Sequence, residues 1–302
     1  MPDLPEFVAF VAEKSGIRKP SLIERDVLIH RILKELNSAF GDAYLFKGGS
    51  SLVKCYFGYY RFSVDLDFTW RRQEVWENLG KKSLRRELVE QAERFGSALE
   101  RIAHDMELDF RCDLKNRNYV EFGSGSRMVT FKLWKGSELI KIQVNFVEKL
   151  LFPPRNVVAK TLLAGREISD DEKAYFREFL EFYHPVKVSA YSLEEILCEK
   201  IRAILTRQAM KLRDIYDMFM IKKAGVKIEL KEEILEKIRF AMRFKKYRIA
   251  LKASMETLNL ESILEDPAEM EMFVIKPEEK FYSFVGELES FLKEITREVL
   301  KM

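Results

Sequence analysis

The most restrictive feature of the sequence is the segment 61–69, in which apolar and polar side chains alternate strictly. Its apolar positions are Phe62, Val64, Leu66 and Phe68. Because the side chains of a β-strand point alternately to its two faces, this segment is predicted to be a half-buried strand. Asp65 and Asp67 then project together from the polar face, where they repel each other unless a cation or hydrogen-bond donors offset the charge. Mg²⁺ binds such a carboxylate pair together with substrate phosphates, and a solvated strand face is the alternative interpretation.

A glycine turn precedes this strand. The short apolar run Ala43–Phe46 is followed by Gly48, Gly49 and Ser50, and then by apolar residues at helical spacing. This order predicts a strand, a turn and a helix. Backbone N–H groups at the start of that helix, together with the Ser50 hydroxyl, can hold phosphate oxygens. A glycine pair before a helix is often a plain turn, but a carboxylate pair on the next element favours a phosphate and metal site.

The rest of the chain divides into a mixed part and a helical part. The expected elements of the mixed part are helices over 20–37 and 74–106, a β-hairpin over 119–134 and a strand over 139–147. Pro153 and Pro154 interrupt the pattern, and from about residue 189 the periodicity is helical. We therefore expect an α+β fold, with a mixed sheet and helices in residues 1–155 and a mainly helical domain in residues 156–302.

Composition narrows the class of protein. Lys and Arg total 52 against 49 Asp and Glu, a net charge of +3, so nucleic-acid binding would need a local cluster of basic residues. The three cysteines have no disulfide or metal spacing, and the three histidines lie far apart. No apolar run approaches the roughly 20 residues of a membrane helix, and the N-terminus lacks a signal-peptide pattern. We expect a soluble, cytoplasmic protein without membrane contact.

A charged group in the helical part could bind phosphates. Lys200, Arg207 and Asp214 are spaced by seven residues and would share one face of a straight helix. Lys and Arg side chains that face an anion pocket would clamp a triphosphate, and a solvated stripe with internal ion pairs is the alternative. Lys200 is expected to project from the helical part into the cleft of the first domain. Its replacement by Ala should then weaken triphosphate binding and, as for a solvent-facing lysine, leave the fold intact.

A basic segment, 237–252, contains no acidic residue. Its basic residues are Lys237, Arg239, Arg243, Lys245, Lys246, Arg248 and Lys252, and its aromatic residues are Phe240, Phe244 and Tyr247. This mixture suits contact with an RNA backbone and stacking on bases. A basic helix whose aromatic side chains face the core is the alternative. The candidates for RNA contact are Arg243, Lys245, Lys246 and Arg248.

Three of these stretches, in this order, resemble the successive motifs of the AbiEii/AbiGii-type nucleotidyltransferase toxins. They read Phe46-Lys-Gly-Gly-Ser-Ser-Leu52, Arg61-Phe-Ser-Val-Asp-Leu-Asp-Phe68, and Glu195 through Lys200 to Arg213-Asp-Ile-Tyr-Asp217. Ile23-Glu-Arg-Asp26 resembles the acidic segment before the family's first catalytic strand. The resemblance implies a DNA polymerase β-like nucleotidyltransferase fold with a helical C-terminal part that completes the active-site cleft. It also implies the toxin of a toxin–antitoxin or phage-defence system, with a cognate antitoxin as partner.

The resemblance also implies an activity and a set of site residues. Such enzymes move a nucleotide from an NTP to an acceptor hydroxyl, in known relatives at tRNA acceptor ends. The implied ligands of the metal, Mg²⁺ or Mn²⁺, are Asp65 and Asp67. The implied catalytic residues are Asp65, Asp67, Lys200 and Asp214. The residues implied for NTP binding are Lys47, Gly48, Gly49, Ser50, Ser63, Lys200 and Arg207.

One departure from the family pattern concerns the third carboxylate, which usually lies on a later strand. The matching stretch offers Gln143 or Asn145, and neither is a strong base. Asp214 is the candidate to accept the proton instead. The alternative to an active enzyme is a non-catalytic nucleotide- or RNA-binding pseudoenzyme of the same fold.

Overall fold

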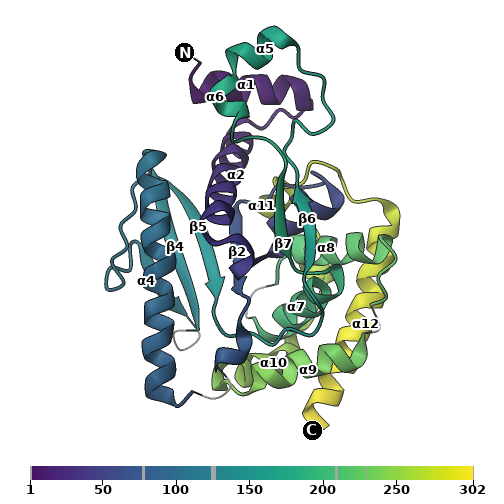
Figure 1. Ribbon diagram of the computed structural model, residues 1–302. Helices are drawn as coiled ribbons and strands as arrows, with labels where there is room; N and C mark the ends of the chain where they lie inside the picture. The colour runs from purple at the N-terminus through teal and green to yellow at the C-terminus, as the bar shows by residue number, and fades with distance from the viewer. Residues whose placement is uncertain (1, 77–78, 124–126, 208–209, 229, 302) are drawn as a thin grey trace. The chain divides into compact units, whose positions relative to one another are not determined.

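The computed structural model of the chain describes residues 2–76, 79–123, 127–207, 210–228 and 230–301. The chain divides into two compact units (Figure 1). The first comprises Met1–Glu148 and Pro154–Ala190, and the second comprises Lys149–Pro153 and Tyr191–Met302. Within the described ranges, no helix is both long and apolar enough to cross a membrane.

The first unit is built around a mixed sheet with the strand order β3-β4-β5-β2-β1-β7-β6. The strands are β1 (Tyr44–Lys47), β2 (Asp65–Trp70), β3 (Val120–Gly123), β4 (Met128–Lys135), β5 (Glu138–Asn145), β6 (Arg155–Ala159) and β7 (Val186–Ala190). β2 lies between β1, which runs antiparallel to it, and β5, which runs parallel to it. Since residues in register on neighbouring strands project from the same face, the pairing fixes which side chains of β1, β2 and β5 lie together.

Helices cover one face of this sheet, and an apolar cluster fills the space between them (Figure 1). The helices of the unit are α1 (Leu4–Ser15), α2 (Pro20–Phe40), α3 (Gly48–Ser51), α4 (Lys81–Asp105), α5 (Asp170–Tyr175) and α6 (Arg177–Leu180), with a π-helix, η2 (Leu52–Phe57), and 3₁₀ turns at Gly41–Ala43 and Gln73–Trp76. The cluster joins α2 and α4 to the buried strand residues Leu66 and Phe68 of β2 and Ile142 of β5. The other face of β2 is therefore the one that carries Asp65 and Asp67.

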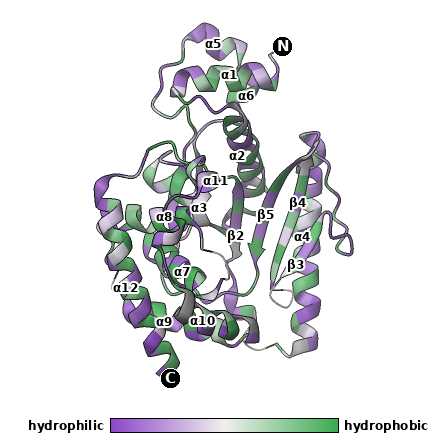
Figure 2. Ribbon diagram, turned by 180° about the vertical axis from the view of Figure 1, so that it is seen from behind, coloured by the Kyte–Doolittle hydropathy of each residue, from purple (hydrophilic) through white to green (hydrophobic). Residues whose placement is uncertain are grey.

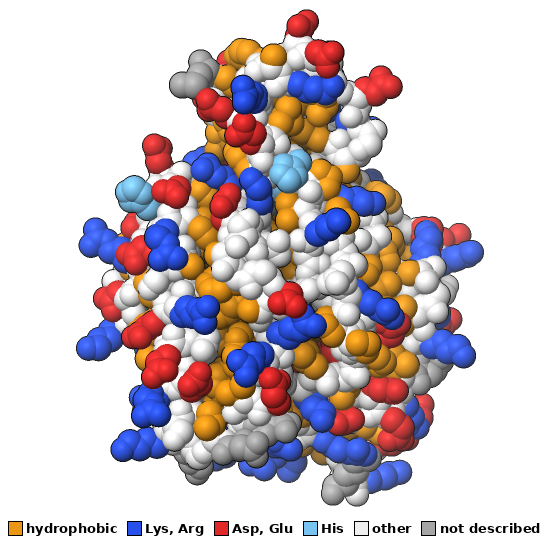
Figure 3. Space-filling view, viewed as in Figure 1, with side chains coloured by type: hydrophobic (Ala, Val, Ile, Leu, Met, Phe, Trp, Pro, Cys, Tyr) orange, Lys and Arg blue, Asp and Glu red, His pale blue; other side chains and the backbone are white. Residues whose placement is uncertain are grey.

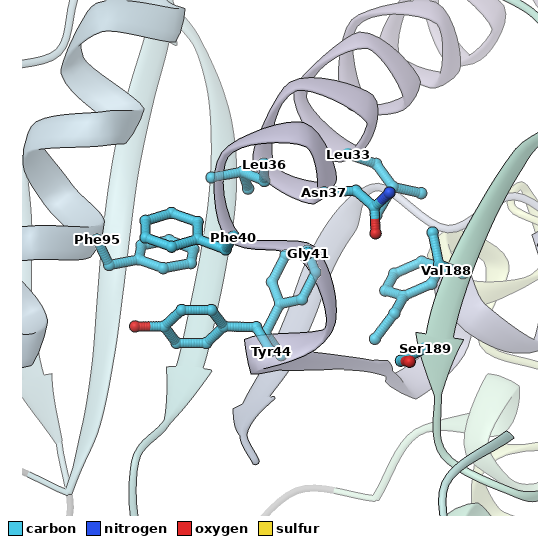
Figure 4. A pocket seen from close by; sticks show the side chains of 11 residues that line it. Leu33, Leu36, Asn37, Phe40, Gly41, Tyr44, Phe95, Val188 and Ser189 are labelled. Atoms are coloured by element: carbon cyan, nitrogen blue, oxygen red, sulfur yellow. The ribbon is translucent and has the colours of Figure 1, made fainter. Parts of the chain in front are cut away.

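A small apolar pocket lies within this packed layer, where α2 ends beside β1 and β7 (Figure 4). The rings of Phe40 and Phe95 stack there with their centroids 5.4 Å apart, and Tyr44 meets Phe95 edge-on at 4.9 Å. Phe46 and Phe68 also line the pocket, so it opens on the apolar side of β1 and β2. It therefore lies away from the carboxylate face.

The second unit is helical. Its elements are α7 (Leu193–Thr206), α8 (Leu212–Lys223), α9 (Lys231–Met242), α10 (Lys245–Thr257), α11 (Pro267–Met270) and α12 (Glu279–Lys301), with a 3₁₀ turn at Glu261–Ile263. α12 alternates between apolar and polar residues along its length (Figure 2), and its buried stripe includes Phe281, Leu288 and Ile295. Basic and acidic side chains are interspersed on the face that Figure 3 shows.

The structure confirms the α+β fold and the helical C-terminal region. The expected order of strand, glycine turn and helix is present at Tyr44–Phe57, although only one α-helical turn forms before the π-helix. The expected hairpin is β3 and β4, and the Ser124 to Ser126 part of its turn lies outside the described residues. The helix within 74–106 is α4.

Two features of the sheet differ from the sequence expectation. The alternating segment becomes a strand only from Asp65. Arg61 and Phe62 are consecutive and both buried, which does not fit a strand with one side facing solvent. β6 and β7 were not anticipated after Pro153 and Pro154; they extend the sheet through β7, whose Ala190 pairs with Phe46 of β1. Residues 156–190 thus belong to the first compact unit. That residues 1–155 and 156–302 form separate domains stays a prediction.

Candidate active site

The carboxylates of Asp65 and Asp67 lie on the polar face of β2, half-buried, while Leu66 and Phe68 between and beyond them are in the core. Asp67 is in register with Lys47 on β1. Among the described residues, no hydrogen bond or ion pair reaches the side chain of Asp65, and the Ser50 hydroxyl donates to its backbone carbonyl oxygen. The protein thus leaves at least this negative charge without internal compensation.

The glycine turn lies directly against Asp67. Gly48 has φ of 74°, a left-handed conformation that disfavours side chains, and a Cβ atom there would overlap the Asp67 carboxylate. The Asp67 Cγ atom would be only 3.2 Å from that Cβ. Glycine at position 48 therefore serves both the turn and the close approach of the carboxylate, and the two sequence motifs meet in one place.

Gly49 makes room for a second side chain, that of Arg61. A Cβ atom at Gly49 would overlap the Arg61 guanidinium and would lie 3.1 Å from the Ser63 Oγ. Arg61 is 2% exposed, and its Nη1 donates to the Phe62 carbonyl oxygen at 2.7 Å. The Oγ atoms of Ser50 and Ser63 are 2.9 Å apart. Of the residues expected to bind NTP, Gly48, Gly49, Ser50 and Ser63 are thus gathered around one turn.

The pairing of β2 with β5 gives the positions of Gln143 and Asn145 relative to the carboxylate pair. Gln143 is in register with Asp67, whereas Asn145 is in register with Thr69, farther along the strand. The Gln143 Nε2 donates to Thr130 Oγ1 at 3.1 Å, and the Asn145 Nδ2 donates to Glu148 at 3.3 Å. Gln143, and not Asn145, is therefore the amide beside the carboxylate pair.

A divalent cation suits this donor set only in part. No group of three or more His, Cys, Asp or Glu side chains within the described ranges could hold a metal ion. Asp65 and Asp67 supply two carboxylates, and Mg²⁺ is often bound by one or two carboxylates plus phosphate oxygens of the substrate. The residues present therefore fit a cation that arrives with a nucleotide better than a metal bound by the protein alone.

Sequence reasoning did not predict two buried arrangements: it left Arg61 out of the site, and it singled out Asp26 only within the Ile23–Asp26 motif, without its partners. The first is Arg61. It is at a polar position of a strictly alternating segment, and that pattern predicts exposure to solvent instead of burial. The second is a network around Asp26 on α2: the Lys54 Nζ lies 2.7 Å from one carboxylate oxygen, and the Tyr59 and Tyr183 hydroxyls donate to the other at 2.9 and 2.6 Å. Burial, followed by the charge of Asp26, raises the pKa of both tyrosines. A lysine in the apolar run after the glycine turn was the available signal for this network.

In the helical unit, Lys200 is buried. Its Nζ lies 2.7 Å from Asp214 and 2.6 Å from Asp217, and Asp217 is fully buried. Arg207 is exposed and lies 3.0 Å from the other Asp214 oxygen. The three residues spaced by seven meet although the helix does not run straight, because α7 ends at Thr206 and α8 begins at Leu212.

The expectation that Lys200 faces solvent is therefore wrong. Two carboxylates from α8 hold its ammonium group, and only 7% of the residue is exposed. Asp214 is held by two cations in the free protein, Lys200 and Arg207. Asp217, which sequence reasoning left out of the site, is the more deeply buried partner.

The basic segment divides between the core and the surface. Lys237 is fully buried, with its Nζ 2.6 Å from Glu195, so this residue is not a surface cation. Arg243, Lys245 and Arg248 are exposed, and the side chain of Lys246 lies outside the described part. The Arg243 guanidinium lies 5.1 Å from the centre of the Phe240 ring.

Comparison with known families gives a match over most of the chain. The family described as nucleotidyl transferase AbiEii toxin, Type IV TA system, matches residues 31–292. No curated protein matches the chain. The matched range includes the glycine turn, the Asp65 and Asp67 pair and the Lys200 cluster.

Proposed function

Because the chain belongs to the AbiEii family of nucleotidyl transferase toxins of type IV toxin–antitoxin systems, we propose that it transfers a nucleotide from an NTP to a hydroxyl group of RNA, with the tRNA end as the favoured acceptor. The observation that carries this proposal is the contact between the Gly48 turn and the Asp67 carboxylate, with an uncompensated Asp65 on the same face. Phosphate-binding backbone and cation-binding carboxylates are what a nucleoside triphosphate requires together.

In this proposal the turn holds the phosphates. Backbone N–H groups from Gly48 onward and the Ser63 hydroxyl are the donors, and the buried Arg61 adds positive charge behind Gly49. Ser50 would support the turn, because its buried hydroxyl lies within hydrogen-bond distance of Ser63 and of the Asp65 carbonyl oxygen. Asp65 and Asp67 would hold Mg²⁺ or Mn²⁺, and the bound cation would neutralise phosphate charge and help align the reacting oxygens. The acceptor oxygen forms a bond to the α-phosphorus as the bond to the bridging oxygen breaks and pyrophosphate leaves.

The helical unit is proposed to contribute Lys200 and Arg207 as phosphate ligands. A triphosphate would compete with Asp214 for both cations. Loss of these ion pairs would make Asp214 a better base, and we assign it the proton of the acceptor hydroxyl. This assignment explains how a carboxylate compensated in the free protein could still act in transfer.

The exposed Arg243, Lys245 and Arg248 are proposed to contact the RNA backbone, with Lys246 as a further candidate. The half-buried rings of Phe240, Phe244 and Tyr247 lie in the same segment, and stacking on bases is their proposed role. Membership of the family implies a cognate antitoxin. Both RNA and NTP are available in the cytoplasm, where we propose that the protein acts.

Labelled NTPs incubated with the protein and total RNA, with and without Mg²⁺, test the proposal. We expect Mg²⁺-dependent transfer of label to RNA, with tRNA as the main product. Transfer to protein alone would contradict the RNA acceptor. NTP binding without transfer to RNA or protein, under conditions in which the antitoxin is absent, would favour a pseudoenzyme and point to Gln143 as its cause.

A further inference from the structure

Lys141 on β5 lies beside the proposed catalytic pair and has no part in the proposal so far. It is in register with Asp65 across the parallel β2–β5 pair. Its neighbours Ile140 and Ile142 are buried in the core, so Lys141 projects from the same face as Asp65, where it is exposed. A cation and an uncompensated carboxylate therefore lie on adjacent strands, about 5 Å apart at the backbone.

The other lysines of the β4–β5 pair are compensated. Lys132 pairs with Glu121 at 2.6 Å, and Lys135 pairs with Glu24. For Lys141 no ion pair is present among the described residues. Lys132 is directly opposite Lys141, and Glu121 offsets part of this like-charge pair: it binds Lys132, and the charge of Lys141 also contributes to lowering the pKa of Glu121.

The position of Lys141 relative to the glycine turn indicates which anionic ligand it could bind. In the sheet order β5-β2-β1, the turn after β1 is on one side of β2 and Lys141 is on the other. An in-line displacement places the attacking oxygen opposite the leaving pyrophosphate. If the triphosphate occupies the turn, the acceptor approaches from the side of β5.

We propose that Lys141 binds a phosphate of the acceptor RNA next to its reacting end. The half-buried Trp134 of β4 is on the same face, in register with Leu139, and offers a ring on which a terminal base can stack. A cation and an indole ring next to Asp65 fit a single-stranded RNA end better than a protein hydroxyl, which carries no phosphate. The inference rests on the proposed function, since it uses the triphosphate position assigned above.

Two measurements on the Lys141→Ala variant test this role. Binding of a short fluorescent single-stranded RNA, measured at several salt concentrations without NTP, should weaken about tenfold, and the salt dependence should fall by about one ion. In the transfer assay the KM for RNA should rise while the KM for NTP and the kcat at saturating RNA stay unchanged. Lys141→Arg should restore most of the RNA affinity because it keeps the charge.

Lys187→Ala provides the matched control. Lys187 is an exposed lysine on β7, and by strand alternation it projects from the same sheet face, but it lies two strands from β2 on the side away from β5. This control should bind RNA like the natural protein. Equal RNA affinity and salt dependence for Lys141→Ala and Lys187→Ala would overturn the inference, as would a higher KM for NTP alone. The binding arm separates this result from failure of the proposed function, which is loss of transfer by the natural protein.

Discussion

Asp65 and Lys200 are both charged residues within the range that matches the AbiEii family, yet their surroundings in the protein differ. Asp65 is half-buried on an open strand face, and no side-chain partner is present for it among the described residues. Lys200 is buried and paired with Asp214 and Asp217. An uncompensated charge costs little in water and is ready for a ligand, whereas a buried, paired charge is part of the fold until a ligand competes for it. The two clusters should therefore respond differently to substitution.

The largest expected effect is on transfer by Asp65→Asn. We expect activity to fall on the order of 10³-fold, because the variant loses a carboxylate from the proposed cation site. Its free energy of unfolding should change by less than about 0.5 kcal/mol, since no internal partner is lost. Rates of label transfer and urea unfolding curves measure both effects. Asp171→Asn, at an exposed carboxylate on α5, should change neither, and an unfolding defect in Asp65→Asn would mean that its charge is structural.

Lys200→Ala should show the reverse pattern in stability. Removal of the ammonium leaves the fully buried Asp217 and the buried Asp214 without their common cation, which costs about 3–5 kcal/mol for a buried pair. Thermal or urea unfolding measures this loss. Lys222→Ala on α8 removes an exposed lysine paired with Glu287 and should cost less than about 1 kcal/mol. If both variants were equally stable, Lys200 would not be the compensated charge that the structure describes.

Acidification should destabilise the protein because His30, a buried residue near the Asp26 network, resists protonation in the folded state. Burial, with repulsion from Lys54, lowers the pKa of His30 to about 3, whereas an unfolded chain has about 6.5. Between these values the unfolded state binds a proton that the folded state does not, so stability falls as pH decreases from 6.5 towards 3. At pH 5 the loss amounts to about 2 kcal/mol.

The variant His30→Gln isolates this contribution. Its amide can still donate to the His184 carbonyl oxygen, which lies 2.7 Å from the His30 Nε2, but it cannot titrate. Between pH 7 and pH 5 the natural protein should lose about 2 kcal/mol more unfolding free energy than the variant does. His104→Gln, at an exposed position, should retain the full pH dependence. Parallel pH profiles for the natural protein and His30→Gln would show that His30 is accessible to protons.

How far the sequence predicted this molecule depends on the range of the interactions involved. The glycine turn and the carboxylate pair follow from local rules, since φ at Gly48 and the alternation at Asp65 and Asp67 are set within a few residues. The burial of Arg61 could not be predicted, because it depends on the space at Gly49, which only the folded chain defines. β7 was missed for the same reason, as its place beside β1 is a pairing over more than a hundred residues.

The helical cluster shows a different limit. The spacing by seven correctly grouped Lys200, Arg207 and Asp214, but the reason was wrong. The prediction assumed one straight helix, whereas α7 ends at Thr206 and α8 begins at Leu212. The residues meet across two helices, and burial of Asp217 at the centre was invisible because a charged residue in a helix is usually taken to face solvent. The choice between Gln143 and Asn145 needed the strand register, which the sequence leaves open.

The smallest expected effect is a gain of activity by Gln143→Asp. A third carboxylate beside Asp67 would strengthen cation binding and supply a base, and we expect a rise of about tenfold or less, because alignment and electrostatic stabilisation already provide most of the acceleration. The Mg²⁺ concentration for half-maximal transfer should fall with it. Asn145→Asp, in register with Thr69, is the control and should leave both quantities unchanged. Equal gains by the two variants would contradict the assignment of Gln143.

The central claim is that the Gly48 turn and Asp67 form one nucleotide site, and NTP binding to two glycine variants tests it most directly. Gly48 and Gly16 both have φ of 74°, and Gly16 is in the left-handed region, where Ala costs about 1–2 kcal/mol of stability. Only at Gly48 does the new methyl overlap Asp67, because nothing lies within 4 Å of a Cβ at Gly16. We predict that Gly16→Ala binds labelled NTP with Mg²⁺ like the natural protein and that Gly48→Ala loses this binding under conditions in which both variants are folded. Equal binding by both variants would contradict the account.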